Sequence, residues 1–354
     1  MDIQQLLHIT VNNKASDLHL IPGVPPALRI DGSLIYASNA PALSHEETHS
    51  MIFSLLNQSQ KEKFILNKEL DFSFSFSGAT GQMGRFRANI YFQKSLICAE
   101  FRFLEPKIKT IEELNLPKNL HNFSSLRQGL VLVTGPTGHG KSTTLAAIIN
   151  EINLNRAVHI LTIEDPIEYI YPPGKSLISQ REMGQDTNSW QTALRSALRE
   201  DPDVVLVGEM RDPEAIASTI TVAETGHLVF STLHTNSASQ SIDRIIDSFP
   251  SSQQAQIRTQ LAVTLKGIIS QRLLLQISGG RIPAVELLLG TNAVASNIRD
   301  GKTYLIDSII QNSQDIGMIP LESSLASLVT TGAISLETAR SYALRQDELL
   351  RLVG

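Results

Sequence analysis

The chain has 354 residues, more than one domain usually holds, and 42% of them are hydrophobic, so two domains with ordinary cores are expected. A net charge of -5, with no run rich in lysine or arginine, argues against direct binding to nucleic acid or anionic lipid. The single cysteine, Cys98, excludes an internal disulfide framework and a cysteine-based zinc site, and it fits a reducing cytoplasm. No stretch reaches the roughly 18 apolar residues that a membrane span needs, so any membrane role must go through a partner.

The N-terminal part of the chain shows the pattern of a small α+β domain, which we assign to residues 1–104. Alternation of apolar and polar residues predicts strands, and helical spacing after a capping residue predicts helices. Strands are expected at 16–20, 27–30, 71–77, 85–92 and 97–104, and helices at 3–11 and 44–56. Turns are expected at Asp31-Gly32 and from Gly78 to Gly84.

The pattern changes after a charged, proline-containing segment, EPKIKTIEE, so we take residues 105–114 as an interdomain linker. Beyond it, strands alternate with helices, which indicates a parallel sheet covered by helices. Strands are expected at 130–133, 158–163, 204–207 and 228–231; from residue 251 the chain is expected to be mostly helical, with a hairpin at 274–288. We therefore predict an α/β domain over residues 115–354.

The segment from Gly135 to Ser142 fits the phosphate-binding pattern G-x-x-x-x-G-K-[ST] at every fixed position. It lies between an apolar run typical of a buried strand and a helical pattern, which is the context that this loop requires. Its glycines turn backbone N–H groups toward a phosphate, its lysine reaches the β- and γ-phosphates, and its serine can hold Mg²⁺. The candidate nucleotide-binding residues are Gly135, Pro136, Thr137, Gly138, His139, Gly140, Lys141, Ser142 and Thr143.

Two carboxylates follow predicted strands. Glu164 lies in TIEDPIE just past one strand, and Glu209 follows the apolar run VVLV, as a Walker B carboxylate does. Open α/β sheets bind ligands at this carboxyl edge of their strands, so Glu209 is expected near the metal or the attacking water. A helix-capping turn at Glu164 and a solvated strand-end glutamate at Glu209 are the structural alternatives.

Histidines and arginines supply further candidates. His227 and His234 bracket a predicted strand, which favours phosphate sensing or metal support over two unrelated polar residues. Arg85 and Arg87 point the same way from one strand, and Arg102 lies on a later one. These arginines either form a solvated face or serve as arginine fingers, which supply positive charge to the nucleotide of a neighbouring subunit.

Six segments, in this order and spacing, resemble the PilT family of type IV pilus retraction ATPases within the secretion ATPase superfamily. They are SDLHL, RFRAN, GPTGHGKST, TIEDPIE, DPDVVLVGEMRD and TGHLVFSTLHTNSA, and the C-terminal SLETARSYALRQDELLRLVG also resembles that family's end. The resemblance implies a PAS-like N-terminal domain, a RecA-like P-loop ATPase domain and a homohexameric ring whose nucleotide sites are clamped between the two. By position, Glu164 is then the catalytic carboxylate, Glu209 the Walker B carboxylate, and His227 and His234 the His-box pair.

The same resemblance implies a motor that hydrolyses ATP with Mg²⁺ to power pilus retraction and twitching motility. Such a motor would be cytoplasmic, held at the inner membrane by a pilus platform protein. Two positions depart from the family: His139 stands where serine or glycine is common, and Ala295 stands where an AIRNLIREGK-like stretch carries arginine. Because that stretch is tied to retraction, the sequence specifies the ATPase activity more closely than it specifies whether the motor drives retraction, extension or secretion.

Three alternative functions remain open. A pilus extension or type II/type IV secretion ATPase of the same superfamily typically carries a tetracysteine zinc insert, which one cysteine cannot form. A VirB11-like or Dot-type secretion ATPase remains possible. A nucleic-acid translocase would need a basic stripe, and none is found. An assembly switch that binds ATP without hydrolysing it would not need both Glu164 and Glu209.

Overall fold

The computed structural model describes residues 2–30, 32–37, 40–77, 83–104 and 107–354, so the predicted turns at Asp31-Gly32 and Gly78–Gly84 and the start of the predicted linker lie partly outside the described residues. The chain forms two compact units. The first contains Met1–Lys107 and Pro166–Ile170, and the second contains Ile108–Asp165 and Tyr171–Gly354. The sequence indicates one boundary, in the linker, and gives no sign that Pro166–Ile170 packs with the first unit.

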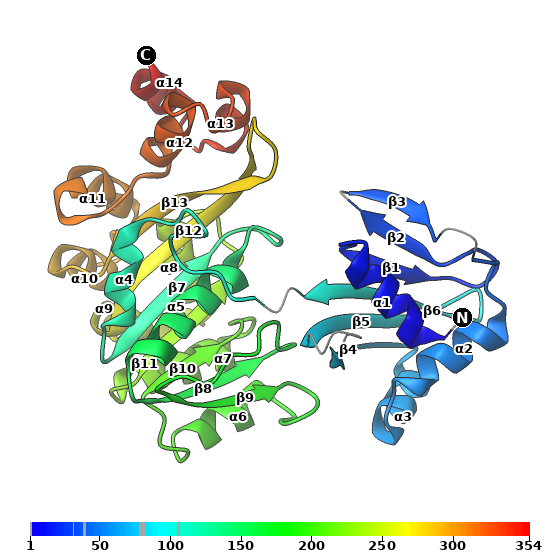
Figure 1. Ribbon diagram of the computed structural model, residues 1–354. Coiled ribbons are helices and arrows are strands. Elements are labelled where there is room, and N and C mark those ends of the chain that lie inside the picture. Colours follow the sequence, from blue (N-terminus) through cyan, green and yellow to red (C-terminus); the bar gives the residue numbers. More distant parts are fainter. Residues whose placement is uncertain (1, 31, 38–39, 78–82, 105–106) are drawn as a thin grey trace. The chain divides into compact units, whose positions relative to one another are not determined.

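The first unit is built on one antiparallel sheet of order β3-β2-β1-β6-β5-β4 (Figure 1). Its strands are β1 Asp17–Leu20, β2 Ala27–Ile30, β3 Ser33–Tyr36, β4 Glu69–Ser77, β5 Met83–Gln93 and β6 Leu96–Leu104. Helices α1 Ile3–Asn12, α2 His45–Ser54 and α3 Gln58–Asn67 complete it. Apolar side chains of the helices and strands share one core, which includes Leu7, Ile52, Phe86 and Phe101. The α+β pattern predicted for this part of the chain is confirmed.

Capping residues define where the helices of the first unit begin. Ser44 accepts a hydrogen bond from Glu47 N, and the Glu47 carboxylate accepts one from Ser44 N, which together satisfy two helix-terminal donors. Asp2 and Asn57 form the same arrangement at α1 and α3. The helix predicted from Ser44 is therefore confirmed, with α2 ending at Ser54.

The second unit is built on a seven-stranded sheet of order β13-β12-β7-β11-β10-β8-β9 (Figure 1). Its strands are β7 Gly129–Thr134, β8 His159–Glu164, β9 Leu177–Glu182, β10 Val204–Val207, β11 Leu228–Leu233, β12 Leu265–Leu275 and β13 Arg281–Leu289. All neighbouring pairs are parallel except β12 and β13, which form an antiparallel hairpin. The expected α/β class with a mainly parallel sheet is confirmed.

Helices surround this sheet and fill the C-terminal part of the chain. They are α4 His121–Ser124, α5 Lys141–Asn155, α6 Trp190–Ala197, α7 Pro213–Glu224, α8 Ala238–Asp247, α9 Ser251–Thr264, α10 Asn292–Arg299, α11 Ile306–Asn312, α12 Leu321–Thr330, α13 Leu336–Tyr342 and α14 Gln346–Val353. Figure 1 shows α12, α13 and α14 gathered at the turn end of the β12–β13 hairpin, where Leu274, Ile282 and Leu325 contribute to a second small core. Among the described residues no helix is long and apolar enough to cross a membrane.

The expectation of helix from residue 251 up to a hairpin at 274 was wrong for residues 265–273. α9 ends at Thr264, and β12 begins at Leu265 and lies between β7 and β13 in the sheet. A short run that is buried on both faces has the same apolar composition as a buried helix, so periodicity does not separate the two. The difference matters because β12 runs beside the strand that leads into the phosphate-binding loop.

Candidate nucleotide-binding site

The phosphate-binding loop connects β7, buried along its whole length, to α5, which begins at Lys141. Three of its glycines, Gly135, Gly138 and Gly140, have positive φ angles of 145°, 80° and 82°. At Gly135 a Cβ would also lie 2.4 Å from the backbone oxygen of Gln271, which no real Cβ contact tolerates. The loop therefore needs glycine both for its backbone conformation and for its close approach to β12.

Lys141 folds back over the loop that it follows. Its Nζ donates to Gly135 O at 2.8 Å and to Pro136 O at 3.1 Å, and it lies 3.4 Å from His234 Nδ1. The side chain is buried, with 9% of the residue exposed. A cation held at this position adds a positive charge to the N-terminal end of α5, where the helix dipole already favours an anion.

Glu209 reaches the loop through His234. Glu209 follows β10 and His234 follows the neighbouring strand β11, and because parallel strands end at one edge their side chains meet there. His234 Nε2 lies 3.1 Å from Glu209 Oε1, and its Nδ1 lies 3.3 Å from Thr137 Oγ1. Arg211 Nε binds the other carboxylate oxygen of Glu209 at 2.9 Å. Glu209, His234 and Lys141 thus form a continuous polar group beside the loop.

Glu164 ends β8, the strand next to β10. Its Oε1 accepts a hydrogen bond from Thr162 Oγ1 at 2.7 Å and lies 3.4 Å from Gln180 Nε2, which comes from β9. Since Val207 is the register partner of Ile163, Glu164 and Glu209 lie at neighbouring strand ends. Gln180 has no signal in the sequence, because β9 is an edge strand without a marked apolar pattern.

His227 and His234 lie at opposite ends of β11, so they are at opposite ends of the parallel strands. His227 precedes β11, and its carbonyl accepts a hydrogen bond from Gly129 N at the start of β7. Its Nδ1 is 3.0 Å from Val222 O. Six strand residues at about 3.3 Å each separate the two ends by about 20 Å. Within one chain the structure therefore does not bring His227 to the phosphate-binding loop, although the sequence pairs it with His234.

The candidate arginines of the first unit are held by contacts inside that unit. Arg85 Nε donates to Ile167 O at 3.1 Å, and Arg85 also contacts Ser73 Oγ. Arg87 lies on β5 with its Nη2 3.8 Å from Asp71 Oδ1, and both side chains are exposed. Arg85 therefore fixes a residue of the segment that directly follows the TIED part of the motif, and Arg87 makes a weak surface ion pair.

Arg102 forms the strongest of these contacts. It lies on β6 with its Nε 2.8 Å from Asp17 Oδ1, and Nη2 lies 3.3 Å from Glu100. Burial acts to raise the pKa of Asp17, but hydrogen bonds and charge from Arg102 and a hydrogen bond from Ser16 outweigh it and hold that pKa below its usual value. The sequence analysis did not single out Asp17. Its signal in the sequence is a carboxylate placed within the predicted strand SDLHL, whose leucines are buried.

A magnesium ion would find oxygen ligands at the loop. No group of three or more histidine, cysteine, aspartate or glutamate side chains suited to a metal occurs among the described residues. Mg²⁺ bound with a nucleotide does not need one, because it keeps several waters and takes only one or two protein oxygens beside the phosphates. Ser142, exposed at the start of α5, and Glu209 provide this kind of donor set.

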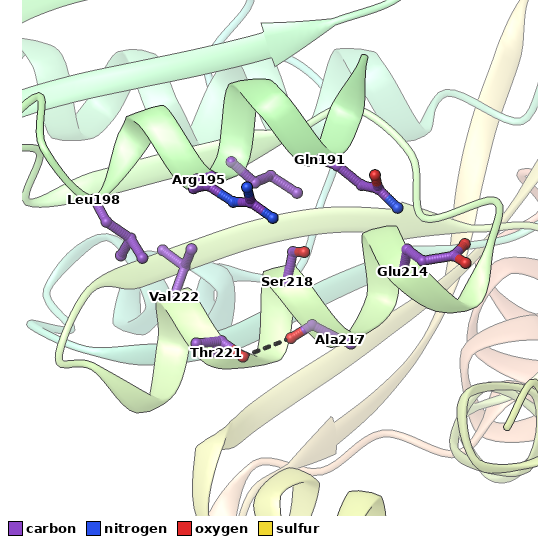
Figure 2. Close-up of a pocket in the computed structure, with 9 residues that line it drawn as sticks. Gln191, Arg195, Leu198, Glu214, Ala217, Ser218, Thr221 and Val222 are labelled. Carbon is purple, nitrogen blue, oxygen red and sulfur yellow. Dashed lines mark hydrogen bonds between the residues drawn. The ribbon is translucent and has the colours of Figure 1, made fainter.

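A separate groove of about 380 Å³ lies between α6 and α7. Figure 2 shows Gln191 and Arg195 of α6 opposite Ser218 and Thr221 of α7. Its full lining is Gln191, Leu194, Arg195, Leu198, Glu214, Ala217, Ser218, Thr221 and Val222. None of the predicted site residues lines it, so this groove is distinct from the phosphate-binding loop.

Known proteins resemble this chain along nearly its whole length. The family model described as Type II/IV secretion system protein matches residues 105–315. The type IV pilus retraction ATPase PilT of Pseudomonas aeruginosa strain PAO1 is 46% identical over 97% of this chain and 98% of its own. The crystal structure of the pilus retraction motor PilT with bound ADP matches with a TM-score of 0.92 at 44% identity, covering 99% of each chain. The X-ray structure of the Legionella pneumophila ATPase DotB matches with a TM-score of 0.80 at 26% identity, over 96% of this chain and 94% of its own.

Proposed function

The chain belongs to the type II/IV secretion system protein family and, within it, to the PilT-type pilus retraction ATPases, and on this basis we propose that it hydrolyses ATP to power retraction of a type IV pilus. That membership confirms the resemblance read from the motifs. The observation that carries the proposal is the group formed by Lys141, His234 and Glu209 beside a glycine-dependent phosphate-binding loop.

Each residue of this group has a role in hydrolysis. Backbone N–H groups of the loop and the Lys141 ammonium bind the phosphates. Ser142 and Glu209 would hold Mg²⁺, which would neutralise charge on the phosphates. Glu164 orients the attacking water and accepts its proton, because it lies at the neighbouring strand end and is held by Thr162. His234 fixes the Glu209 carboxylate and senses the phosphate through Thr137.

The working assembly is proposed to be a homohexamer at the cytoplasmic face of the inner membrane, bound to a pilus platform protein. In such a ring, arginines of one subunit supply charge to the nucleotide of the next, a contribution of roughly 10³ to 10⁵ in rate in other P-loop enzymes. Arg87 is the candidate that needs the least rearrangement, since its partner Asp71 is 3.8 Å away and exposed. Arg102 would first have to leave Asp17.

The motor of a secretion system is the second candidate function. It shares this fold, as the DotB structure does at 26% identity. Identity of 46% to a retraction ATPase over almost the full chain favours retraction. Ala295, the departure noted in the retraction-linked stretch, is partly buried on α10 against the main core of the second unit, which includes Leu132, Val205 and Ile242. Measuring whether the gene restores twitching to a retraction-deficient strain separates the two candidates.

Steady-state hydrolysis without nucleic acid tests the enzymatic proposal. Lys141→Ala is expected to lower both ATP binding and turnover, the latter by several orders of magnitude, because a partly desolvated phosphate loses its cation. Glu164→Gln and Glu209→Gln are expected to bind ATP and lose turnover. Glu224→Gln, an exposed carboxylate at the far end of α7, is the matched control and should be unaffected. Hydrolysis at the wild-type rate by Lys141→Ala would refute the assignment.

Mixed rings test the contribution of a neighbouring subunit. Lys141→Ala subunits mixed with Arg87→Ala subunits are expected to recover activity, since each supplies what the other lacks at a shared interface. An equal mixture of Lys141→Ala and Glu164→Gln subunits is the control, because both changes lie in one nucleotide site. Full assembly with no recovery for the first mixture would exclude Arg87 as a residue acting between subunits.

A further inference from the structure

Strand β12 continues beyond the end of its neighbour β7. The last register pair between them is Ser270 with Thr134, after which the chain leaves β7 and turns into the phosphate-binding loop. β12 continues to Leu275. On the side facing the loop, no strand of the described part of the chain therefore pairs with residues 271–273 of β12, and their backbone groups need other partners.

Arg272 Nη1 donates to one of these groups, Gln271 O, at 3.1 Å, and the loop residue His139 is the partner of another, Leu273 N. Leu273 N donates to His139 Nδ1 at 3.0 Å. Gln271, which is 3% exposed, donates from Nε2 to His139 O at 2.8 Å. Its other amide atom, Oε1, accepts from Thr144 Oγ1 at 2.7 Å on the first turn of α5. His139 is thus held both through its ring and through its backbone by alternate residues of one strand.

We propose that His139 is a positioning residue, whose neutral ring stands in for the missing strand partner of β12 and holds the phosphate-binding loop in its ATP-binding shape. The proposal rests on the ATPase function proposed above. The ring of His139 binds Leu273 N and its carbonyl binds Gln271 Nε2, so the side chain acts by holding the loop backbone against β12. Its effect on hydrolysis is therefore expected in ATP affinity more than in the chemical step.

The same strand also fixes the segment that follows His234. Arg272, only 4% exposed, donates to Asn236 O at 2.6 Å and to Asn236 Oδ1 at 3.1 Å. Asn236 comes two residues after His234, whose ring lies 3.4 Å from Lys141 Nζ. Residues 271–273 of β12 therefore hold both the phosphate-binding loop, through His139, and the segment after His234, through Asn236. Loss of the His139 contact should disturb the loop on which Lys141 folds back.

The ring must be neutral to accept this hydrogen bond. Burial, together with the positive charges of Arg272 on β12, Lys141 on α5 and Arg281 on β13, lowers the pKa of His139 below its usual value. Tyr342 of α13 also faces the ring, with the centroids 6.0 Å apart. Protonation would place a hydrogen on Nδ1, which would then face the N–H of Leu273. Two donors would meet, and the hydrogen bond could not form. The contact is therefore complete above the usual histidine pKa and is lost as pH falls through the lowered one.

Two amide substitutions test the inference as a matched pair. In His139→Asn the amide oxygen can occupy the place of Nδ1 and does not titrate, whereas in His139→Gln the amide lies one carbon further out, at the place of Nε2. ATP affinity and turnover are measured for both and for the wild type between about pH 5.5 and 8. His139→Asn should bind ATP within about 2-fold of wild type at pH 8, and His139→Gln roughly 10-fold more weakly, because the part-buried N–H of Leu273 loses its acceptor.

The acid part of the pH profile gives a second readout. The ATP affinity of the wild type should fall more steeply toward about pH 5.5 than that of His139→Asn. The ATP phosphates also titrate in this range, but their effect is the same for both proteins and drops out of the comparison. Peptide-level hydrogen exchange of residues 271–275 should be faster in His139→Gln than in His139→Asn, independently of activity. Equal affinity and equal exchange in the two variants would overturn the inference. A wild type without ATP hydrolysis would instead refute the proposed function, and the exchange comparison would still decide the role of His139.

Discussion

Glu286 provides a prediction whose sign depends on pH. It lies on β13 and is 2% exposed, and its Oε1 accepts a hydrogen bond from Ala238 N, 2.7 Å away at the start of α8. Burial raises its pKa from 4.5 to about 7; the Ala238 hydrogen bond opposes this rise, while the charges of Asp307 and Glu322 add to it. Above that pH the folded protein must hold an ionised carboxylate to which no cation of the described residues is bonded. We therefore expect Glu286→Gln to stabilise the protein at alkaline pH.

The magnitude follows from linkage between protonation and folding. One pKa unit is worth about 1.36 kcal/mol, so raising the pKa from 4.5 to about 7 corresponds to about 3 kcal/mol. The folded state binds the proton more tightly than the unfolded state, so this stabilisation is complete below pH 4.5 and is lost as pH rises through about 7. Glutamine keeps the neutral acceptor at every pH. The variant should therefore match the wild type near about pH 4.5 and exceed it by about 3 kcal/mol above about pH 8.

Trp190 makes the measurement possible, because it is the only tryptophan in the chain and packs against the main core of the second unit. Urea unfolding followed by its fluorescence at two pH values gives the change in unfolding free energy. Glu322→Gln is the control: Glu322 is fully buried and binds Arg345 Nη2 at 3.0 Å, so its loss should destabilise the unit at both pH values. A gain for Glu286→Gln that does not depend on pH, or a loss at alkaline pH, would refute the reasoning.

Two ion-paired side chains, Asp17 and His121, give further pH-dependent predictions. Asp17→Asn should destabilise the first unit at neutral pH by about 1–3 kcal/mol, because Arg102 loses a buried partner. In thermal melting the difference should begin to shrink as pH falls below 3.8, the usual value, and should vanish only below the lowered pKa of Asp17 in the folded protein. His121 bonds Glu151 and Glu112 at 2.8 and 2.6 Å, and chiefly the Glu151 bond raises its pKa. His121→Gln should therefore lower the melting temperature at about pH 6 and have less effect as pH rises past the raised pKa; an equal effect at about pH 9 would contradict this.

Local patterns in the sequence determined the phosphate-binding loop. Consecutive residues specify it, since glycine is required at positive φ and Lys141 must follow directly at the start of a helix. The places of Glu164, Glu209 and His234 were also predictable, because each comes just after a recognisable strand and parallel strands end at one edge. Period-2 alternation likewise predicted most strands of the first unit.

Only the tertiary structure decided which distant residues complete the site. β12 could not be placed from its apolar run, so neither Gln271 nor the bond from Leu273 to His139 could be foreseen. Strand direction, not sequence spacing, sends His227 to the opposite end of the parallel strands. The pairing of Arg102 with Asp17 depends on the register of β1 against β6, which joins residues 85 positions apart. Each of these contacts is fixed by strand order and register, and a single sequence encodes neither of them locally.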